Sequence, residues 1–200
     1  MPAVRSELLD IVNDAYPETF EGVTPTKLLG EAVFSGPAPH PNEVLILSIQ
    51  QKLVSALPMA YYMAVRRGVD RLMDRRLPRG TTLPPDVLQS AIKGLIALRE
   101  LELNEIHHLV LSSKAPHPSK NCPLRKITGP GGSDAHQRVI DRIAGSSPSG
   151  TKVLEVLSLS GLYGGDSDGF CESCVREWKA GHAEVRKKAW NMLPNAFGLQ

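Results

Sequence analysis

An uninterrupted run of helix-spaced apolar residues in the middle of the chain constrains the fold most. Between Asp86 and Leu111 the apolar positions recur three and four residues apart, which is the spacing of one buried helix face. These positions are Leu88, Ala91, Ile92, Leu95, Ile96, Leu98, Leu101, Leu103, Ile106, Leu109 and Val110. Pro84 and Pro85 favour a helix start just before the run, and Gly94 is its only weak point. The pattern predicts a helix of about 25 residues that spans the domain.

The rest of the chain also has helical rather than strand periodicity. Helices are predicted over residues 4–15, 26–34, 42–57, 59–76, 133–144, 151–159 and about 172–192. Gly68 is a weak point or an end within the fourth of these. Only residues 44–47 could form a strand by composition alone. We therefore expect an all-α fold, an irregular helical bundle with one long central helix and a C-terminal loop–helix knuckle that contains cysteines.

Charge and hydropathy favour a soluble protein. The 200 residues include 23 basic and 21 acidic side chains, and the net charge of +2 does not imply a polyanionic partner. The longest stretch without a charged residue, residues 53–65, has 13 residues, whereas a bilayer-spanning helix needs about 20. The first residues lack the apolar segment of a signal peptide. We expect an intracellular protein, cytoplasmic or nuclear, that does not contact a membrane.

The three cysteines give the sharpest chemical signal. Cys171 and Cys174 form a CxxC pair at the start of the closing helix, and Cys122 could add a third thiolate to one structural zinc ion. A tetrahedral site needs a fourth ligand. His182 follows Cys174 by eight residues, about 12 Å along a continuous helix, which is too far to share one ion. We therefore prefer His117, in the Pro-rich segment before Cys122; the alternative is that the cysteines are ordinary reduced thiols.

The sequence contains no recognisable catalytic constellation. Residues 145–152 resemble a phosphate-binding loop, but the lysine follows the threonine instead of preceding it, and the residues before them have a helical pattern. Ser133, Asp134 and His136 are residue types of a catalytic triad, but triad members come from separate parts of a fold. A helix cap explains Ser133 more simply. We expect that the protein is not an enzyme and has no catalytic residues.

Six arginines suggest an alternative function. Together with Asp70 and Asp74 they give a local charge of +4, as in a phosphate-binding surface. Their spacing is also typical of a solvated helix face with internal ion pairs, which makes nucleic acid the less favoured partner. The alternative function is that of a zinc-stabilised nucleic-acid-binding protein. The arginines are Arg66, Arg67, Arg71, Arg75, Arg76 and Arg79.

Several segments, in their order along the chain, resemble one known family. They are Leu57-Pro-Met-Ala-Tyr-Tyr62, Leu83-Pro-Pro-Asp-Val-Leu88, Cys122 after a Pro-rich stretch, Phe170-Cys-Glu-Ser-Cys174 and Trp190-Asn-Met-Leu-Pro-Asn-Ala-Phe-Gly-Leu199. Together they resemble the region C-terminal to the BTB/POZ core in fungal BTB-domain proteins, over nearly the whole chain. The resemblance implies a non-enzymatic scaffold for protein–protein interaction, with a BTB core or a ligase component as its partner. It also implies a BACK-like helical bundle over residues 1–115 and a cysteine-containing helical region over 116–200 packed on it, as one continuous domain.

The sequence departs from this family in two places. The strands of a BTB core are missing before the helix over residues 4–13, so we expect a region that lacks that core and its dimerisation role. Relatives often have a further cysteine a few residues after the position of Cys122, where this chain has Lys126. A zinc knuckle like that of the family is then either rebuilt with His117 as a replacement ligand or degenerate in this chain. The apolar residues 57–65 are expected to face either the protein's own core or a BTB domain.

Overall fold

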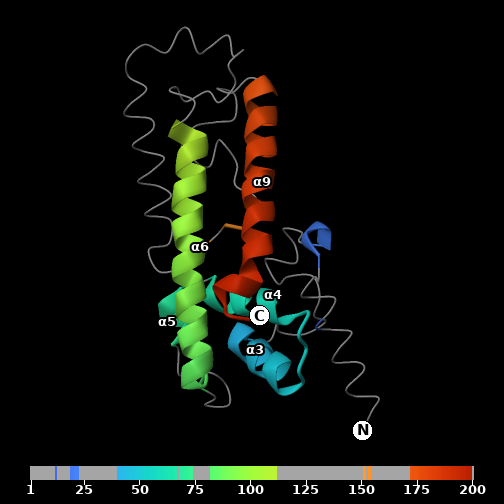
Figure 1. The fold of residues 1–200 in the computed structure, drawn as a ribbon, viewed down its shortest axis with the longest axis vertical. Helices are drawn as coiled ribbons and strands as arrows, with labels where there is room; N and C mark the ends of the chain where they lie inside the picture. The colour runs from blue at the N-terminus through green and yellow to red at the C-terminus, as the bar shows by residue number, and fades with distance from the viewer. Residues whose placement is uncertain are drawn as a thin grey trace.

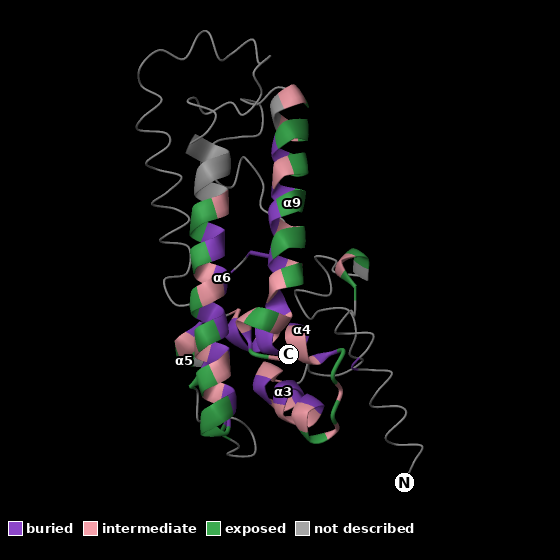
Figure 2. Ribbon diagram, viewed as in Figure 1, coloured by how far each residue is buried: buried purple, intermediate pink, exposed green. Residues whose placement is uncertain are grey.

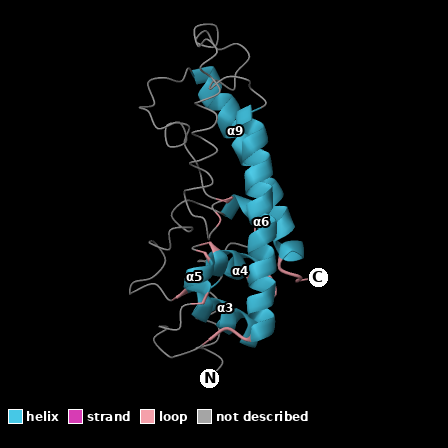
Figure 3. Ribbon diagram, turned by 90° about the vertical axis from the view of Figure 1, so that its left-hand side faces the viewer, coloured by secondary structure: helices cyan, strands magenta, loops and turns pink. Residues whose placement is uncertain are grey.

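The computed structural model describes residue 12 and residues 19–22, 40–66, 68–73, 82–111, 151, 153–154 and 172–199 (Figure 1). Regular structure within these ranges is helical and includes no strand (Figure 3), which confirms the predicted all-α fold. The elements are the 3-10 helix η1 (Phe20–Gly22) and the α-helices α3 (Pro41–Gln50), α4 (Leu57–Val65), α5 (Val69–Leu72), α6 (Pro85–Leu111) and α9 (Glu172–Ala196). The helices predicted over 26–34 and 133–144 lie outside the described residues, as does the helix over 4–15 except for Val12, which is helical and buried.

Two long helices, α6 and α9, pack side by side and form the main contact of the described part (Figure 1). Glu105 of α6 pairs with Lys188 of α9, whereas Gly94 of α6 meets Phe197 just beyond the end of α9. Residue numbers rise along one helix as they fall along the other, so the two helices are antiparallel. The predicted long helix is confirmed at α6, which has 27 residues, and α9 is nearly as long, with 25 residues.

Each long helix buries one stripe of side chains at three- and four-residue spacing. The stripe of α6 comprises Val87, Ala91, Leu95, Leu98 and Leu101, and that of α9 comprises Trp178, His182, Val185, Ala189 and Leu193. Figure 2 shows buried residues on the sides that the two helices turn toward each other. The closing helix runs four residues past the predicted end at Met192, because Leu193 and then Phe197 continue the same buried stripe.

Helices α3 and α4 pack together next to the C-terminal end of α9 (Figure 1). A capping box starts α3: the Asn42 amide donates to Nδ1 of His40 at 3.2 Å, and the His40 amide donates to Oε2 of Glu43 at 3.4 Å. The Asn42 side chain donates from Nδ2 to the Leu72 carbonyl at 3.1 Å, which ties α3 to α5. Residues 44–47, for which composition also allowed a strand, are helical in α3.

The predicted helix over residues 42–57 is wrong in its end point, because α3 stops at Gln50. Lys52 adopts the left-handed region, with φ of 56°, and the amides of Lys52 and Leu53 donate to the carbonyls of Ile49 and Ser48. These two bonds form a Schellman motif, which normally has glycine at the left-handed position. The motif stops the helix seven residues before the predicted end.

The predicted helix over residues 59–76 is interrupted at Gly68, as the sequence indicated. Gly68 has φ of 97°, and α4 ends at Val65 before α5 begins at Val69. Glycine allows the positive φ without the steric cost that a Cβ atom would bring. The chain therefore turns between two short helices instead of continuing as one.

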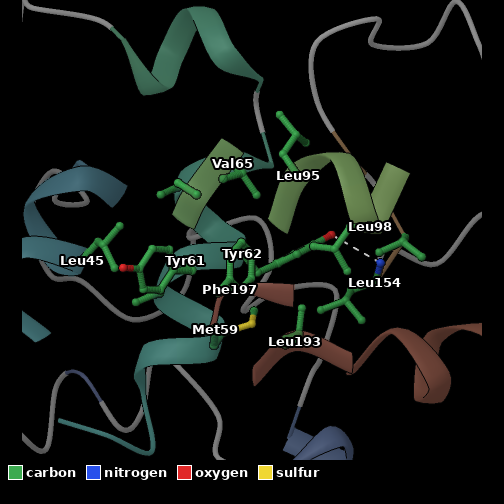
Figure 4. Close-up of a cluster of buried hydrophobic side chains, with 14 of the residues drawn as sticks. Leu45, Met59, Tyr61, Tyr62, Val65, Leu95, Leu98, Leu154, Leu193 and Phe197 are labelled. Carbon is green, nitrogen blue, oxygen red and sulfur yellow. Dashed lines mark hydrogen bonds between the residues drawn. The ribbon is translucent and has the colours of Figure 1, made fainter. Parts of the chain in front are cut away.

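The core gathers side chains from α3, α4, α6 and α9 around Tyr62 (Figure 4). Met59 and Tyr62 are fully buried, so the apolar residues 57–65 face the protein's own core, one of the two predicted alternatives. The Phe197 ring stacks on Tyr61 with centroids 4.9 Å apart and lies against α6 at Gly94. A Cβ atom on Gly94 would overlap Cδ1 and Cε1 of that ring, so this close approach requires glycine.

Candidate functional site

A buried polar cluster lies where Thr151, Val153 and Leu154 meet the helices, and we call these three residues and their hydrogen-bond partners the 151–154 junction. Glu102 of α6 is only 2% exposed. Its Oε2 accepts hydrogen bonds from Nη1 of Arg99 and from Oγ1 of Thr151, each at 3.1 Å. A buried carboxylate is costly unless charge and hydrogen bonds compensate it, and this pair of donors supplies both.

The backbone of the 151–154 junction is bound on both sides. The Leu154 amide donates to the Tyr62 hydroxyl of α4 at 3.3 Å (Figure 4), and the Leu154 carbonyl accepts from Nε of Arg186 of α9 at 2.7 Å. The Thr151 amide donates to the Arg66 carbonyl at 3.3 Å. The junction therefore holds α4, α6 and α9 to one segment through hydrogen bonds that bury polar groups without leaving them unpaired.

Arg186 connects this junction to η1. Its guanidinium carbon lies 5.3 Å from the centroid of the Phe20 ring, within range of a cation–π interaction. Burial lowers the pKa of Arg186, and the nearby Tyr62 opposes that shift. An arginine keeps its charge at neutral pH even so. One cation thus joins the 151–154 junction, α9 and η1.

His182 is a buried histidine on the inner stripe of α9. Its ring stacks on Trp178 with centroids 5.6 Å apart and an interplanar angle of 8°. Burial, and then the charge of Arg186, lower the pKa of His182 to about 4, so the ring is neutral at pH 7. Its Nε2 has no hydrogen-bond partner in the described part of the chain. Since α9 is continuous from Glu172, His182 lies about 12 Å along the helix from Cys174.

The four predicted zinc ligands cannot be compared with described side chains. Cys122, Cys171 and His117 lie outside the described residues, and Cys174 is placed only as backbone in the first turn of α9. No group of three or more His, Cys, Asp or Glu side chains that could hold a metal ion occurs among the residues described. The zinc site stays a prediction from the sequence.

Of the six arginines in the predicted cluster, the structure describes the side chain of Arg66 alone. Arg66 is half-buried at the end of α4, and Gly68 separates it from Arg71 of α5, so these two arginines do not share one straight helix face. The other members lie outside the described residues, apart from the backbone of Arg71.

The helix predicted over residues 151–159 is wrong at its start, since Thr151, Val153 and Leu154 are not helical and instead form the 151–154 junction.

The solvent side of α6 presents apolar side chains. Ile96 is 54% exposed and Leu103 is 37% exposed, although both belong to the apolar pattern that predicted this helix. They lie seven residues apart, two turns along one face, and the charged Lys93 and Glu100 alternate with them. We call Gln89, Lys93, Ile96, Glu100, Leu103 and Asn104, all exposed, the outer face of α6.

Sequence reasoning missed both the 151–154 junction and the outer face of α6. The partners of Thr151 and Leu154 are 49 and 92 residues away in the chain, and no local pattern signals such contacts. The outer face did leave a signal, because the predicted helix has more apolar positions than one buried stripe uses. Ile96 and Leu103 were the surplus.

None of the described helices is long and apolar enough to cross a membrane. No family model matches the chain, and neither a curated protein nor a solved structure matches it. The likeness to fungal BTB proteins therefore rests on the residues quoted from the sequence.

Proposed function

We propose that this chain is a non-enzymatic protein-interaction module, a helical scaffold that presents the outer face of α6 to a protein partner. The observation that carries the proposal is the exposure of Ile96 and Leu103 on a helix whose opposite side is buried in the core. Apolar side chains flanked by polar and charged ones on a rigid element offer a partner an apolar contact with a polar rim. The packing on α9 and the 151–154 junction hold α6 in place, so a partner would meet a preorganised helix.

The resemblance to fungal BTB proteins suggests a BTB core or a ligase component as a partner of the chain, without assigning that partner to a surface. The packing of α6, from the predicted region 1–115, against α9, from the region 116–200, supports the proposal that both regions form one continuous domain. Nothing among the described contacts favours the alternative of a nucleic-acid surface at the arginines, so one function is proposed.

Site-specific photo-crosslinking tests this function. A photoreactive amino acid at position 96 should give discrete protein adducts in the cells that produce the chain, because Ile96 points to solvent on the outer face of α6. The matched control is position 179, where Lys179 is exposed on α9 and outside this face. Adducts at 96 that are absent at 179 support the proposal, whereas no protein adduct at 96, or the same adducts at both positions, contradicts it.

We propose further that Cys122, Cys171, Cys174 and His117 bind one structural zinc ion. In support of this, Cys174 lies in the first turn of α9 and Cys171 directly precedes that helix in the sequence, so a metal there would fix the start of α9. Elemental analysis of the purified chain should give one zinc per molecule, and Cys171→Ser should lose it. A folded, metal-free wild-type protein would rule the site out.

A further inference from the structure

The outer face of α6 has a charge order that matches itself when one helix is reversed. Lys93 lies three residues before Ile96, and Glu100 lies four residues after it. If a second α6 runs antiparallel, with the twofold axis passing between residues 96 and 97, residue 93 of each helix lies opposite residue 100 of the other. Lys93 of each helix then faces Glu100 of the other, so the two contacts each join opposite charges, and Ile96 lies at the axis. A parallel pair would instead place lysine against lysine and glutamate against glutamate.

The remaining positions of the face are consistent with the same arrangement. In this register Gln89 lies opposite Asn104, so two side-chain amides face each other at the ends of the contact. Leu103 lies opposite Ser90, and the half-buried Ala97 next to the axis allows the helices to approach closely. Four of the six residues of the outer face thus pair with one another, and the two copies of Ile96 lie next to each other at the axis, which is compatible with an isologous interface between two identical chains.

We propose that the outer face of α6 binds the same face of a second copy of this chain, with the two helices antiparallel. This inference rests on the proposed function, because it names the partner of that surface. The contact covers about four turns of each helix and falls into the class of small interfaces, below about 1,200 Å² in total. We therefore expect reversible association, with a dissociation constant in the micromolar range rather than the nanomolar range.

Charge reversal on the full chain tests the pairing. Lys93→Glu makes both charges of the face acidic, and Glu100→Lys makes both basic; each residue is exposed, so each variant should fold as the wild type does. Sedimentation equilibrium should show that each single variant self-associates about tenfold more weakly than the wild type. An equimolar mixture of the two single variants should associate with each other, and the double variant should recover self-association. Lys187→Glu, an exposed charge on α9, is the matched control and should associate as the wild type does.

Each outcome decides the inference. A wild-type chain that stays monomeric up to about 0.5 mM, well above a micromolar dissociation constant, overturns it; this is also the result expected if another segment of the same chain covers the face. Association that is unchanged in both single variants overturns it too, because another surface must then carry the contact. Crosslinks from position 96 to a different protein, together with a monomeric wild type, would leave the proposed function standing and refute only the second copy.

Discussion

Replacing Gly94 by alanine should destabilise the protein, against the usual effect of this substitution in a helix. In an exposed helix interior, alanine is favoured over glycine by about 1 kcal/mol. Here the new Cβ atom would overlap Cδ1 and Cε1 of Phe197 and lie 3.0 Å from Cγ. The ring has little room to move, because Phe197 is 1% exposed and stacked on Tyr61.

The magnitude follows from two opposing terms. Overpacking a well-filled core costs about 1–3 kcal/mol, and an overlap this deep lies at the upper end. Subtracting the helix gain of about 1 kcal/mol leaves a net loss of about 2 kcal/mol in the free energy of unfolding. For a chain of 200 residues this corresponds to a fall of about 4–8 °C in Tm.

Urea unfolding followed by tryptophan fluorescence measures this change, since Trp178 and Trp190 both lie on α9. The control introduces Gly94→Ala into a Phe197→Ala background, in which the overlap is gone and alanine at 94 should stabilise by about 1 kcal/mol. A Gly94→Ala protein as stable as the wild type, or the same loss in both backgrounds, would refute the argument that Phe197 requires glycine at this position.

Three further predictions test other parts of the structure. Lys52→Gly should raise the free energy of unfolding by about 1 kcal/mol, because glycine adopts the left-handed backbone without strain. Gly198→Ala, at the equivalent position after α9, should lower it by a similar amount. Equal stability of the wild type, Lys52→Gly and Gly198→Ala in urea would contradict this. Folding lowers the pKa of His182 from 6.5 to about 4, so between these two pH values the unfolded chain binds a proton at this residue and the folded chain does not. The free energy of unfolding should therefore fall by up to about 3 kcal/mol as the pH is lowered from 6.5 to 4. His182→Gln should remove that part of the pH dependence, and an unchanged profile in thermal melts would count against it. Thr151→Val should cost about 1–3 kcal/mol because Glu102 loses a buried donor, while Thr151→Ser should be close to wild type; equal losses would show that the hydroxyl is not what matters.

The parts of the fold that sequence could predict are those set by local patterns. The start of α6 was predicted to within one residue, because Pro85 and the apolar spacing act within a few residues of each other. The break at Gly68 was visible for the same reason. The end of α3 could not be predicted, because Lys52 adopts a left-handed conformation that is normally associated with glycine, and a lysine in the sequence does not indicate such a conformation.

The candidate surfaces were harder to predict, because they depend on tertiary packing. The apolar pattern could not separate Ile96, which faces solvent, from Leu95 beside it, which is buried in the core; only the tertiary packing of the helices decides between them. The contact of Thr151 with Glu102 joins residues far apart in the chain, so its segment looked like the start of a helix. The predicted zinc ligands remain a sequence hypothesis, as do the BTB relationship and the partner.

The close approach of Phe197 to Gly94 has a consequence for how α6 and α9 can move relative to each other. Gly94 is the only glycine in α6, so sliding α9 by one turn in either direction would drive the Phe197 ring into the side chain of Ser90 or Leu98. The contact between Gly94 and Phe197 therefore favours one axial setting of the two long helices, and sliding them by a turn would lose it.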